Sequence, residues 1–370
     1  FRASLNFGQQ TLDAWIADRL GVASPLTRHD IGAWQLRRLR ETVARVRDSS
    51  PYYRERLAAF PRDFPRSLED LARLPCTDEH EIREHGLAML CVPQDQVARV
   101  VSLASSGTTG PAKRLFFSQS DLELTMDFFL HGMRTLVSPG QRVCILLPGE
   151  TPDGTGDMLA RALGRMNVAA RVHGLVRDPL TALAQAEAFD AHCLVGFPVP
   201  LLQLARLAER QGRTYAPQSL LLCSDHIALS LRRELERLWA CRVFAHYGTV
   251  ETGLGGGVEC AARCGIHLRE ADLFVEILDP DQGRPVPDGQ WGEIVASTLT
   301  REAMPLVRYR TGDLGRLLPG VCACGSVIRR LDTVRGRLAQ AARLPDRADR
   351  ADRADRADRP DGSQLFLGRL

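Results

Sequence analysis

Residues 102–113 read Ser-Leu-Ala-Ser-Ser-Gly-Thr-Thr-Gly-Pro-Ala-Lys. Gly107 and Gly110 permit close approach of a ligand to the backbone. Hydroxyl groups that can donate to phosphate oxygens, together with exposed amides, come from Ser105, Ser106, Thr108 and Thr109. Lys113 is the only lysine in the sequence and adds a mobile cation for a triphosphate. The stretch does not match G-x-x-x-x-G-K-[ST], and its composition alone suits a polar surface loop equally well.

A second motif, residues 246–253, reads His-Tyr-Gly-Thr-Val-Glu-Thr-Gly and follows the apolar segment 242–245. We expect that segment to be a strand, and open α/β sheets bind ligands at strand ends. Tyr247 can stack on a purine, and Glu251 can hold a Mg²⁺ ion that bridges phosphates. The alternative is a glycine-rich turn with a solvated glutamate.

A third motif, residues 305–314, reads Pro-Leu-Val-Arg-Tyr-Arg-Thr-Gly-Asp-Leu. The carboxylate of Asp313 follows a Thr-Gly turn and can accept hydrogen bonds from both hydroxyls of a ribose. An isolated aspartate is more often a surface charge. Three motifs in this order favour a nucleotide site.

Together the motifs resemble the S-S-G-T-T-G-x-P-K, Y-G-x-[ST]-E and Y-R-T-G-D signatures of the adenylate-forming (AMP-dependent synthetase/ligase) superfamily. Residues 50–56, 68–75 and 298–305 resemble its phenylacetate–CoA ligase branch in particular, and the resemblance runs from about residue 36 to residue 338. It implies an α/β fold, the large N-terminal body of an adenylate-forming enzyme. This body has layered α/β subdomains and a small β-barrel-like subdomain, with the C-terminal domain mostly absent.

The resemblance also assigns roles to residues. Lys113, Glu251 and Arg337 would be catalytic, with Arg337 reaching the ribose and phosphate. Nucleotide-binding positions would be Ser105, Ser106, Gly107, Thr108, Thr109, Gly110, Ser224, Asp225, His246, Tyr247, Gly248, Thr249 and Asp313. The acyl pocket would involve residues 196–198 and 253–257.

Four departures from the family pattern stand out. Val250 replaces a hydroxyl residue, so Thr249 or Thr252 would have to supply that phosphate contact. Ser224-Asp225 stands where the adenine-side loop reads G-A-E, and Ala339-Gln340 replaces the acidic hinge residues. No lysine follows Lys113, so the lysine that completes adenylation in the family is absent.

The reaction that the resemblance implies is ATP-dependent activation of a carboxylic acid as an acyl-adenylate, followed by transfer to CoA, with Mg²⁺ as cofactor. Alternatives are a relative that acts on a deazaflavin coenzyme or a protein thiol, and a weakened nucleotide-binding module. The chain is also consistent with a fragment of a longer ligase.

Cys260, Cys264, His267, Cys322 and Cys324 offer soft sulfur and nitrogen ligands from two separate loops. Such a set suits tetrahedral Zn²⁺, although reduced thiols without metal are the alternative. The resemblance implies a structural zinc held by Cys260, His267, Cys322 and Cys324. Cys264 would then be a spare ligand or a substitute for His267.

Composition limits the remaining possibilities. The 370 residues carry 48 Lys+Arg against 45 Asp+Glu, a balance that does not indicate nucleic-acid binding. No apolar run approaches the roughly 18–20 residues of a membrane span, and the scattered cysteines indicate a reducing compartment, so we expect a cytoplasmic protein. A homodimer is left open.

The order of patterns predicts three parts. Residues 1–90 form a helical segment, since Leu36, Leu39, Val43 and Val46 recur at helical spacing until residues 51–53 end the run. Residues 91–337 form the AMP-binding body, with strands at 143–147 and 192–195, helices at 199–209 and 230–239, and a hairpin over 273–278 and 291–297. Residues 338–370 contain a hinge remnant, an Ala-Asp-Arg repeat over 346–359 and the start of a C-terminal domain.

Overall fold

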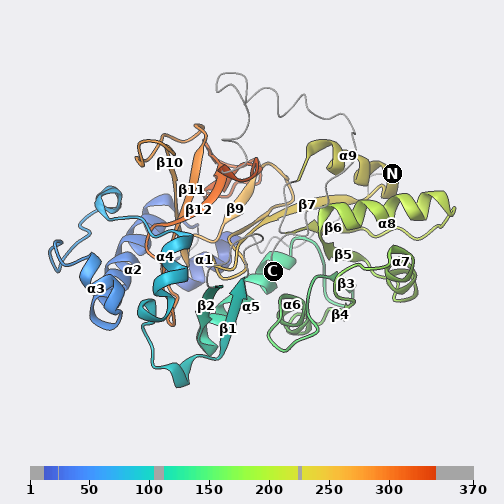
Figure 1. Cartoon of the computed structure of the whole chain (residues 1–370). Helices are drawn as coiled ribbons and strands as arrows, with labels where there is room; N and C mark the ends of the chain where they lie inside the picture. The colour runs from blue at the N-terminus through green and yellow to red at the C-terminus, as the bar shows by residue number, and fades with distance from the viewer. Residues whose placement is uncertain (1–11, 24, 104–111, 224–226, 339–370) are drawn as a thin grey trace.

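The N-terminal part of the chain is helical, as the spacing of its apolar residues predicts. The structure, a computed structural model, describes residues 12–23, 25–103, 112–223 and 227–338. The N-terminal helices are α1 (Leu12–Leu20), α2 (Arg28–Ser49), α3 (Pro51–Arg56) and α4 (Glu79–His85), with short 3₁₀ turns at Glu69–Arg73, Gly86–Met89 and Gln94–Gln96. The helices α2, α3 and α4 lie at one side of the molecule, and α1 lies nearer its middle (Figure 1).

Local sequence sets the ends of α2. Thr27 and Asp30 form a capping box at its start, which satisfies backbone amides that the first turn leaves unpaired. The helix ends at Ser49, and α3 begins at Pro51, whose missing N–H is not needed at a first helical position. The break predicted at residues 51–53 is therefore confirmed and is also the start of a second helix.

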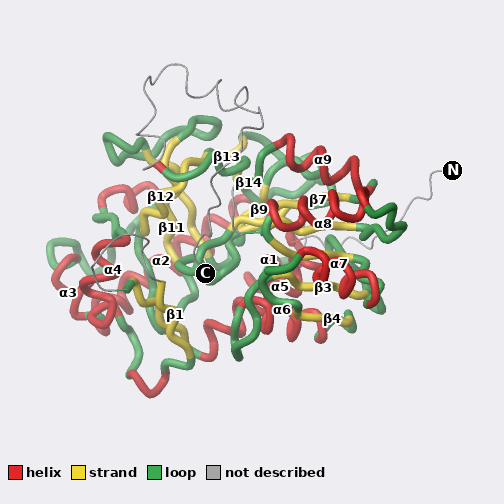
Figure 2. The backbone as a smooth tube through the Cα atoms, turned by 45° about the vertical axis from the view of Figure 1, so that its right-hand side comes forward, coloured by secondary structure: helices red, strands yellow, loops and turns green. Residues whose placement is uncertain are grey.

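A nine-stranded mixed sheet forms the centre of the molecule. Its strand order is β13-β14-β9-β8-β7-β6-β5-β3-β4. The parallel half consists of β3 (Arg142–Leu146), β4 (Ala169–Val172), β5 (Cys193–Gly196), β6 (Ser219–Leu222) and β7 (Arg242–Tyr247). The antiparallel half continues from β7 through β8 (Gly257–Glu259), β9 (Ile266–Leu268), β14 (Arg330–Leu331) and β13 (Leu317–Leu318). The two halves lie at opposite ends of one sheet (Figure 2).

Helices cover both faces of the parallel half. The helices α5 (Gln119–Met133) and α6 (Thr155–Gly164) share a core with Val143 and Ile145 of β3. On the other face Cys144 and Leu146 pack with α7 (Pro179–Ala188), α8 (Pro198–Arg210) and α9 (Leu229–Trp239). Successive strand residues point to opposite faces, so a strand between two helical layers must be apolar throughout. The predicted α/β layering is confirmed.

Two smaller sheets flank the large one. The strands β10 (Leu273–Leu278), β11 (Gly292–Thr298) and β12 (Tyr309–Gly315) form a three-stranded antiparallel sheet, which contains the predicted hairpin. The strands β1 (Arg99–Leu103) and β2 (Lys113–Phe117) pair antiparallel, with Leu103 opposite Lys113. The first motif therefore connects two paired strands.

Helix α2 ties the N-terminal part to the body. Trp34 Nε1 donates to the carbonyl oxygen of Ala271 at 2.8 Å, and Gln35 Nε2 donates to the carbonyl oxygens of Glu270 and Leu273 at 3.1 Å each.

Within the described ranges, no helix has the length and apolar character that a membrane span requires.

Candidate active site

The second motif lies where the parallel half of the large sheet meets the antiparallel half. The strand β7 ends at Tyr247, and residues 248–256 connect it to β8. A Cβ at Gly248 would lie 2.8 Å from His246 Cε1 and 2.9 Å from the carbonyl oxygen of Leu254. Only glycine fits this turn, because those contacts are shorter than side-chain carbons adopt.

The segment 196–198 starts from the same edge of the sheet. Gly196 ends β5, and Phe197 is the residue directly before α8. Because β5, β6 and β7 are parallel, their carboxyl ends meet at one edge. The structure therefore places the expected acyl-pocket segment on the same edge as Tyr247.

Lys113 of the first motif and Glu251 of the second form a buried ion pair, although 138 residues separate them. Each side chain is 6% exposed. Burial opposes ionisation of the Glu251 carboxyl, but the adjacent Lys113 ammonium outweighs this effect and lowers the pKa of Glu251. The pair places Lys113, the cation expected to bind phosphate, directly beside the expected magnesium ligand.

Three residues that the motifs do not assign surround this pair. The Tyr309 hydroxyl donates to Glu251 Oε1 at 3.0 Å, and Arg301 Nη1 donates to the Glu251 carbonyl oxygen at 2.8 Å. Glu79, the first residue of α4, lies 3.8 Å from Lys113 Nζ. Tyr309 and Arg301 belong to stretches singled out in the sequence, whereas nothing in the sequence marks Glu79.

The third motif completes the site from the three-stranded sheet. Asp313 Oδ2 accepts a hydrogen bond of 3.1 Å from the Tyr247 hydroxyl, and Asp313 Oδ1 lies 3.1 Å from Arg337 Nε. Arg337 also donates to the carbonyl oxygen of Thr311 at 2.6 Å. Burial raises the pKa of Asp313, and the Arg337 charge partly opposes this shift. Asp313, Tyr247 and Arg337 are thus brought together from three segments.

Gly312 is required for this arrangement. Its φ of 74° lies in the left-handed region, and the pairing of β11 with β12 shifts register between Glu293 and Val295. An added Cβ would lie 3.4 Å from Arg337 Nη1. The Thr-Gly step therefore turns the strand so that Asp313 meets Arg337.

Val250 and its neighbours have structural roles in the loop. Val250 is buried in the core. Thr252 Oγ1 accepts from the Thr249 amide at 3.0 Å and donates to the Thr249 carbonyl oxygen at 3.0 Å. Thr252 is therefore occupied in holding its own turn. Both His246 ring nitrogens are buried and have no hydrogen-bond partner among the described residues.

Several expected nucleotide contacts lie outside the described residues. They are Ser105, Ser106, Gly107, Thr108, Thr109, Gly110, Ser224 and Asp225, and the hinge positions Ala339-Gln340 and the Ala-Asp-Arg repeat lie there too.

Residues 79–300 of the chain match a family model described as "AMP-binding enzyme". The chain belongs to the AMP-binding enzyme family. Its relatives include the phenylacetate-coenzyme A ligase of Thermus thermophilus, which is 32% identical over 84% of this chain and 71% of the relative. The enzyme of the same name from Pseudomonas putida is 33% identical over 82% of this chain and 70% of the relative. The phenylacetate–CoA ligase branch expected from the motifs is confirmed.

Solved structures of AMP-binding enzymes share the fold. A crystal structure of 2-hydroxyisobutyryl-CoA ligase with 2-HIB-AMP and CoA, in the thioesterification state, matches with a TM-score of 0.77 and 21% identity. The match covers 85% of this chain and 69% of that chain. An open conformation of the same ligase gives a TM-score of 0.76 at 20% identity.

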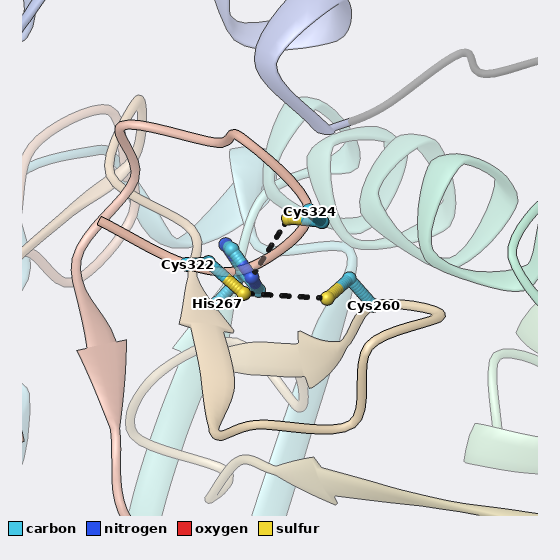
Figure 3. A group of neighbouring side chains, drawn as sticks. All are labelled: Cys260, His267, Cys322 and Cys324. Atoms are coloured by element: carbon cyan, nitrogen blue, oxygen red, sulfur yellow. Dashed lines mark hydrogen bonds between the residues drawn. The ribbon is translucent and has the colours of Figure 1, made fainter.

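A cluster of potential metal ligands lies beside the antiparallel half of the large sheet, with His267 on β9 and the three cysteines in connecting segments. Ligand atoms of Cys260, His267, Cys322 and Cys324 all lie within 4.8 Å of one another (Figure 3). Two of the distances between these ligand atoms are 3.7 Å: the distance from Cys260 Sγ to Cys322 Sγ and the distance from Cys324 Sγ to His267 Nε2. Sulfur ligands at Zn–S bond lengths in a tetrahedron would lie about 3.8 Å apart.

Cys264 does not belong to this cluster. Its side chain is exposed, and its thiol contacts the carbonyl oxygen of Ala262 at 3.1 Å. His267 is instead almost fully buried on β9, facing Cys324. The geometry therefore favours His267 over Cys264 as the fourth ligand.

Proposed function

We propose that the chain binds ATP with Mg²⁺, activates a carboxylic acid as an acyl-adenylate and transfers the acyl group to CoA. The observation that carries the proposal is the convergence of Lys113, Glu251, Tyr247, Asp313 and Arg337 from four distant segments. The names of the relatives, phenylacetate-coenzyme A ligases, support this reaction class and an aryl acid as substrate.

Different residues of the site can bind different parts of the nucleotide. The carboxylate of Asp313 can accept both ribose hydroxyls, which would replace its present contact with Tyr247 or Arg337. Tyr247 then offers its ring to the base, and Lys113 offers its charge to the phosphates. Arg337 lies beside Asp313 and can therefore contact both the ribose and the α-phosphate.

Glu251 fits a divalent cation. Its carboxylate offers the hard oxygen ligand that Mg²⁺ prefers. The Lys113 ammonium now lies against Oε1, so the site already stabilises a positive charge at this atom. When bound, Mg²⁺ would neutralise charge on the phosphates.

The chemistry consists of two displacements. A substrate carboxylate oxygen forms a bond to the α-phosphorus while the bond to pyrophosphate breaks. The sulfur of CoA then attacks the acyl carbon of the adenylate, and AMP leaves. Lys113, once its ammonium contacts the phosphates, contributes by stabilising charge on the departing pyrophosphate.

We also propose one structural zinc ion, held by Cys260, His267, Cys322 and Cys324. The tetrahedral spacing supports it, and four protein ligands would close the coordination shell and exclude a catalytic water. The ion would join the β8–β9 hairpin to the segment that follows β13.

Calorimetric titration of Mg·ATP tests the nucleotide site. Lys113→Ala should weaken binding by about 1.5–3 kcal/mol, since it removes a charge-assisted hydrogen bond. Arg114→Ala is the matched control, because Arg114 is the next residue on β2 and its side chain is exposed. Equal affinities for parent and Lys113→Ala would contradict the proposed phosphate site.

Turnover is measured separately from nucleotide binding, because binding of Mg·ATP does not by itself show that an acid is activated. Pyrophosphate release is followed with phenylacetate, other aryl acids and aliphatic acids, with and without CoA. Release that depends on the acid, together with an acyl-CoA product, is expected. Nucleotide binding without acid-dependent release from any acid would overturn the ligase assignment and leave a nucleotide-binding module.

A further inference from the structure

Strand β12 contacts the end of β7 and the loop that follows it at two points, each through a tyrosine hydroxyl and a carboxylate. At the first point the hydroxyl of Tyr247, the last residue of β7, donates to Asp313 of β12 at 3.1 Å. At the second the roles are exchanged, and Tyr309 of the strand bonds Glu251 of the loop, at 3.0 Å. The proposed nucleotide site uses both residues of the first contact but only Glu251 of the second.

Tyr309 is rigidly placed. Its side chain is 3% exposed, and its backbone pairs with Ala296 of β11 on one side and Thr77 on the other. A phenol is protonated near neutral pH, so the Tyr309 hydroxyl is the donor in its 3.0 Å hydrogen bond to the Glu251 carboxylate. Glu251 Oε1 therefore has a neutral donor on one side and the Lys113 ammonium on another.

The two donors differ in what happens when a nucleotide binds. Lys113 has other acceptors available, since Glu79 Oε1 lies 3.8 Å from its ammonium and phosphate oxygens would attract it more strongly. Tyr309 is part of a paired strand and has no such freedom. When the ammonium moves to a phosphate, Tyr309 still holds the carboxylate.

We propose that Tyr309 is a positioning residue that orients the Glu251 carboxylate for a divalent cation, so that it controls the Mg²⁺ dependence of nucleotide binding. This inference rests on the proposed function, since it requires Mg·ATP at this site. Residues that orient a metal ligand typically change metal affinity by 10–100-fold when they are removed. Tyr309→Phe keeps the ring and removes only the donor.

The test measures ATP binding by calorimetry at fixed ATP over a range of Mg²⁺ concentrations, and Mn²⁺ binding by electron paramagnetic resonance. Tyr309→Phe should raise the metal concentration at the midpoint by about 10-fold or more and leave binding of metal-free ATP unchanged. Tyr53→Phe is the matched control. Tyr53 is also buried, and its hydroxyl bonds Thr77 and the Val307 amide rather than Glu251.

The double variant shows whether Tyr309 acts through Glu251. In the Glu251→Gln background, Tyr309→Phe should shift the midpoint no further. An unchanged midpoint in Tyr309→Phe, or an equal shift in Tyr53→Phe, would overturn the inference while leaving the nucleotide site intact. Failure of the parent chain to bind Mg·ATP would instead remove the proposed function and this inference together. A circular-dichroism spectrum and a melting temperature equal to those of the parent establish that each variant is folded. If Tyr309→Phe is not folded, Tyr309→Leu is used instead, because it also removes the hydroxyl.

Discussion

His246 is only partly buried, but both of its ring nitrogens are buried, and this one side chain can make the stability of the whole chain depend on pH. Burial lowers the pKa of this imidazole to about 4, because the charged form has no partner among the described residues. The unfolded chain binds a proton near pH 6.5, so the folded state binds fewer protons between those values. The stabilising contribution is therefore complete above about pH 6.5 and is lost as the pH falls towards 4. Between pH 7 and pH 5, urea unfolding of the parent should lose about 1–2 kcal/mol more than that of His246→Phe. His80→Phe, at an exposed position, is the control, and equal pH slopes for the parent and His246→Phe would show that the imidazole does not titrate in this range.

At the scale of elements, the proposed zinc site joins two pieces of the sheet that are weakly paired on their own. The strands β13 and β14 are two residues each, and β8 and β9 are three residues each. Such short strands form few hydrogen bonds with their neighbours, so a closed metal site would contribute directly to the stability of the fold. Metal analysis of protein purified without a metal-affinity column should find about one zinc per chain in the parent and in Cys264→Ser, and much less in Cys322→Ser. A chelator should lower the melting temperature of the first two proteins. Full zinc content in Cys322→Ser would show that the ligand set is wrong.

At the scale of the whole molecule, Arg308 joins the N-terminal segment to the three-stranded sheet. Its guanidinium is 3% exposed, bonds the Glu276 carboxylate of β10 at 3.1 and 3.3 Å, and donates to the carbonyl oxygens of Ala72 and Leu74 at 2.9 and 2.6 Å. Arg308→Met leaves a buried carboxylate without its partner and should cost about 3–5 kcal/mol of unfolding free energy in urea. Arg308→Met combined with Glu276→Met should recover much of that loss, because two apolar side chains leave no uncompensated charge. Arg73→Met, which breaks a partly exposed pair with Asp70, should change stability far less than Arg308→Met. A similar loss in the single and double variants would mean that the packing of Arg308, rather than its charge, joins the two parts.

Local patterns in the sequence were sufficient to predict most elements of the body. The segment predicted as a strand at 143–147 is β3, and the helix predicted at 230–239 is α9, each within one residue of its observed bounds. Periodicity succeeds here because each element must bury one face or both faces. The four elements of the antiparallel half are too short to leave a periodic signal, and for that reason the sequence did not predict them.

The sequence by itself determined which residue types the site uses. Lys113, Glu251 and Asp313 are recognisable because their proposed roles, in binding a phosphate, a cation and a ribose, require particular groups beside particular turns. Only the tertiary structure decided which groups meet: Lys113 contacts Glu251, Tyr309 supports the same carboxylate, and His267 rather than Cys264 faces Cys324. These contacts depend on strand order and on the crossing of distant segments, which local spacing does not encode. Physically, a motif specifies the chemistry that a few neighbouring atoms can perform, while the packing of the sheets and helices fixes the distances at which that chemistry becomes available.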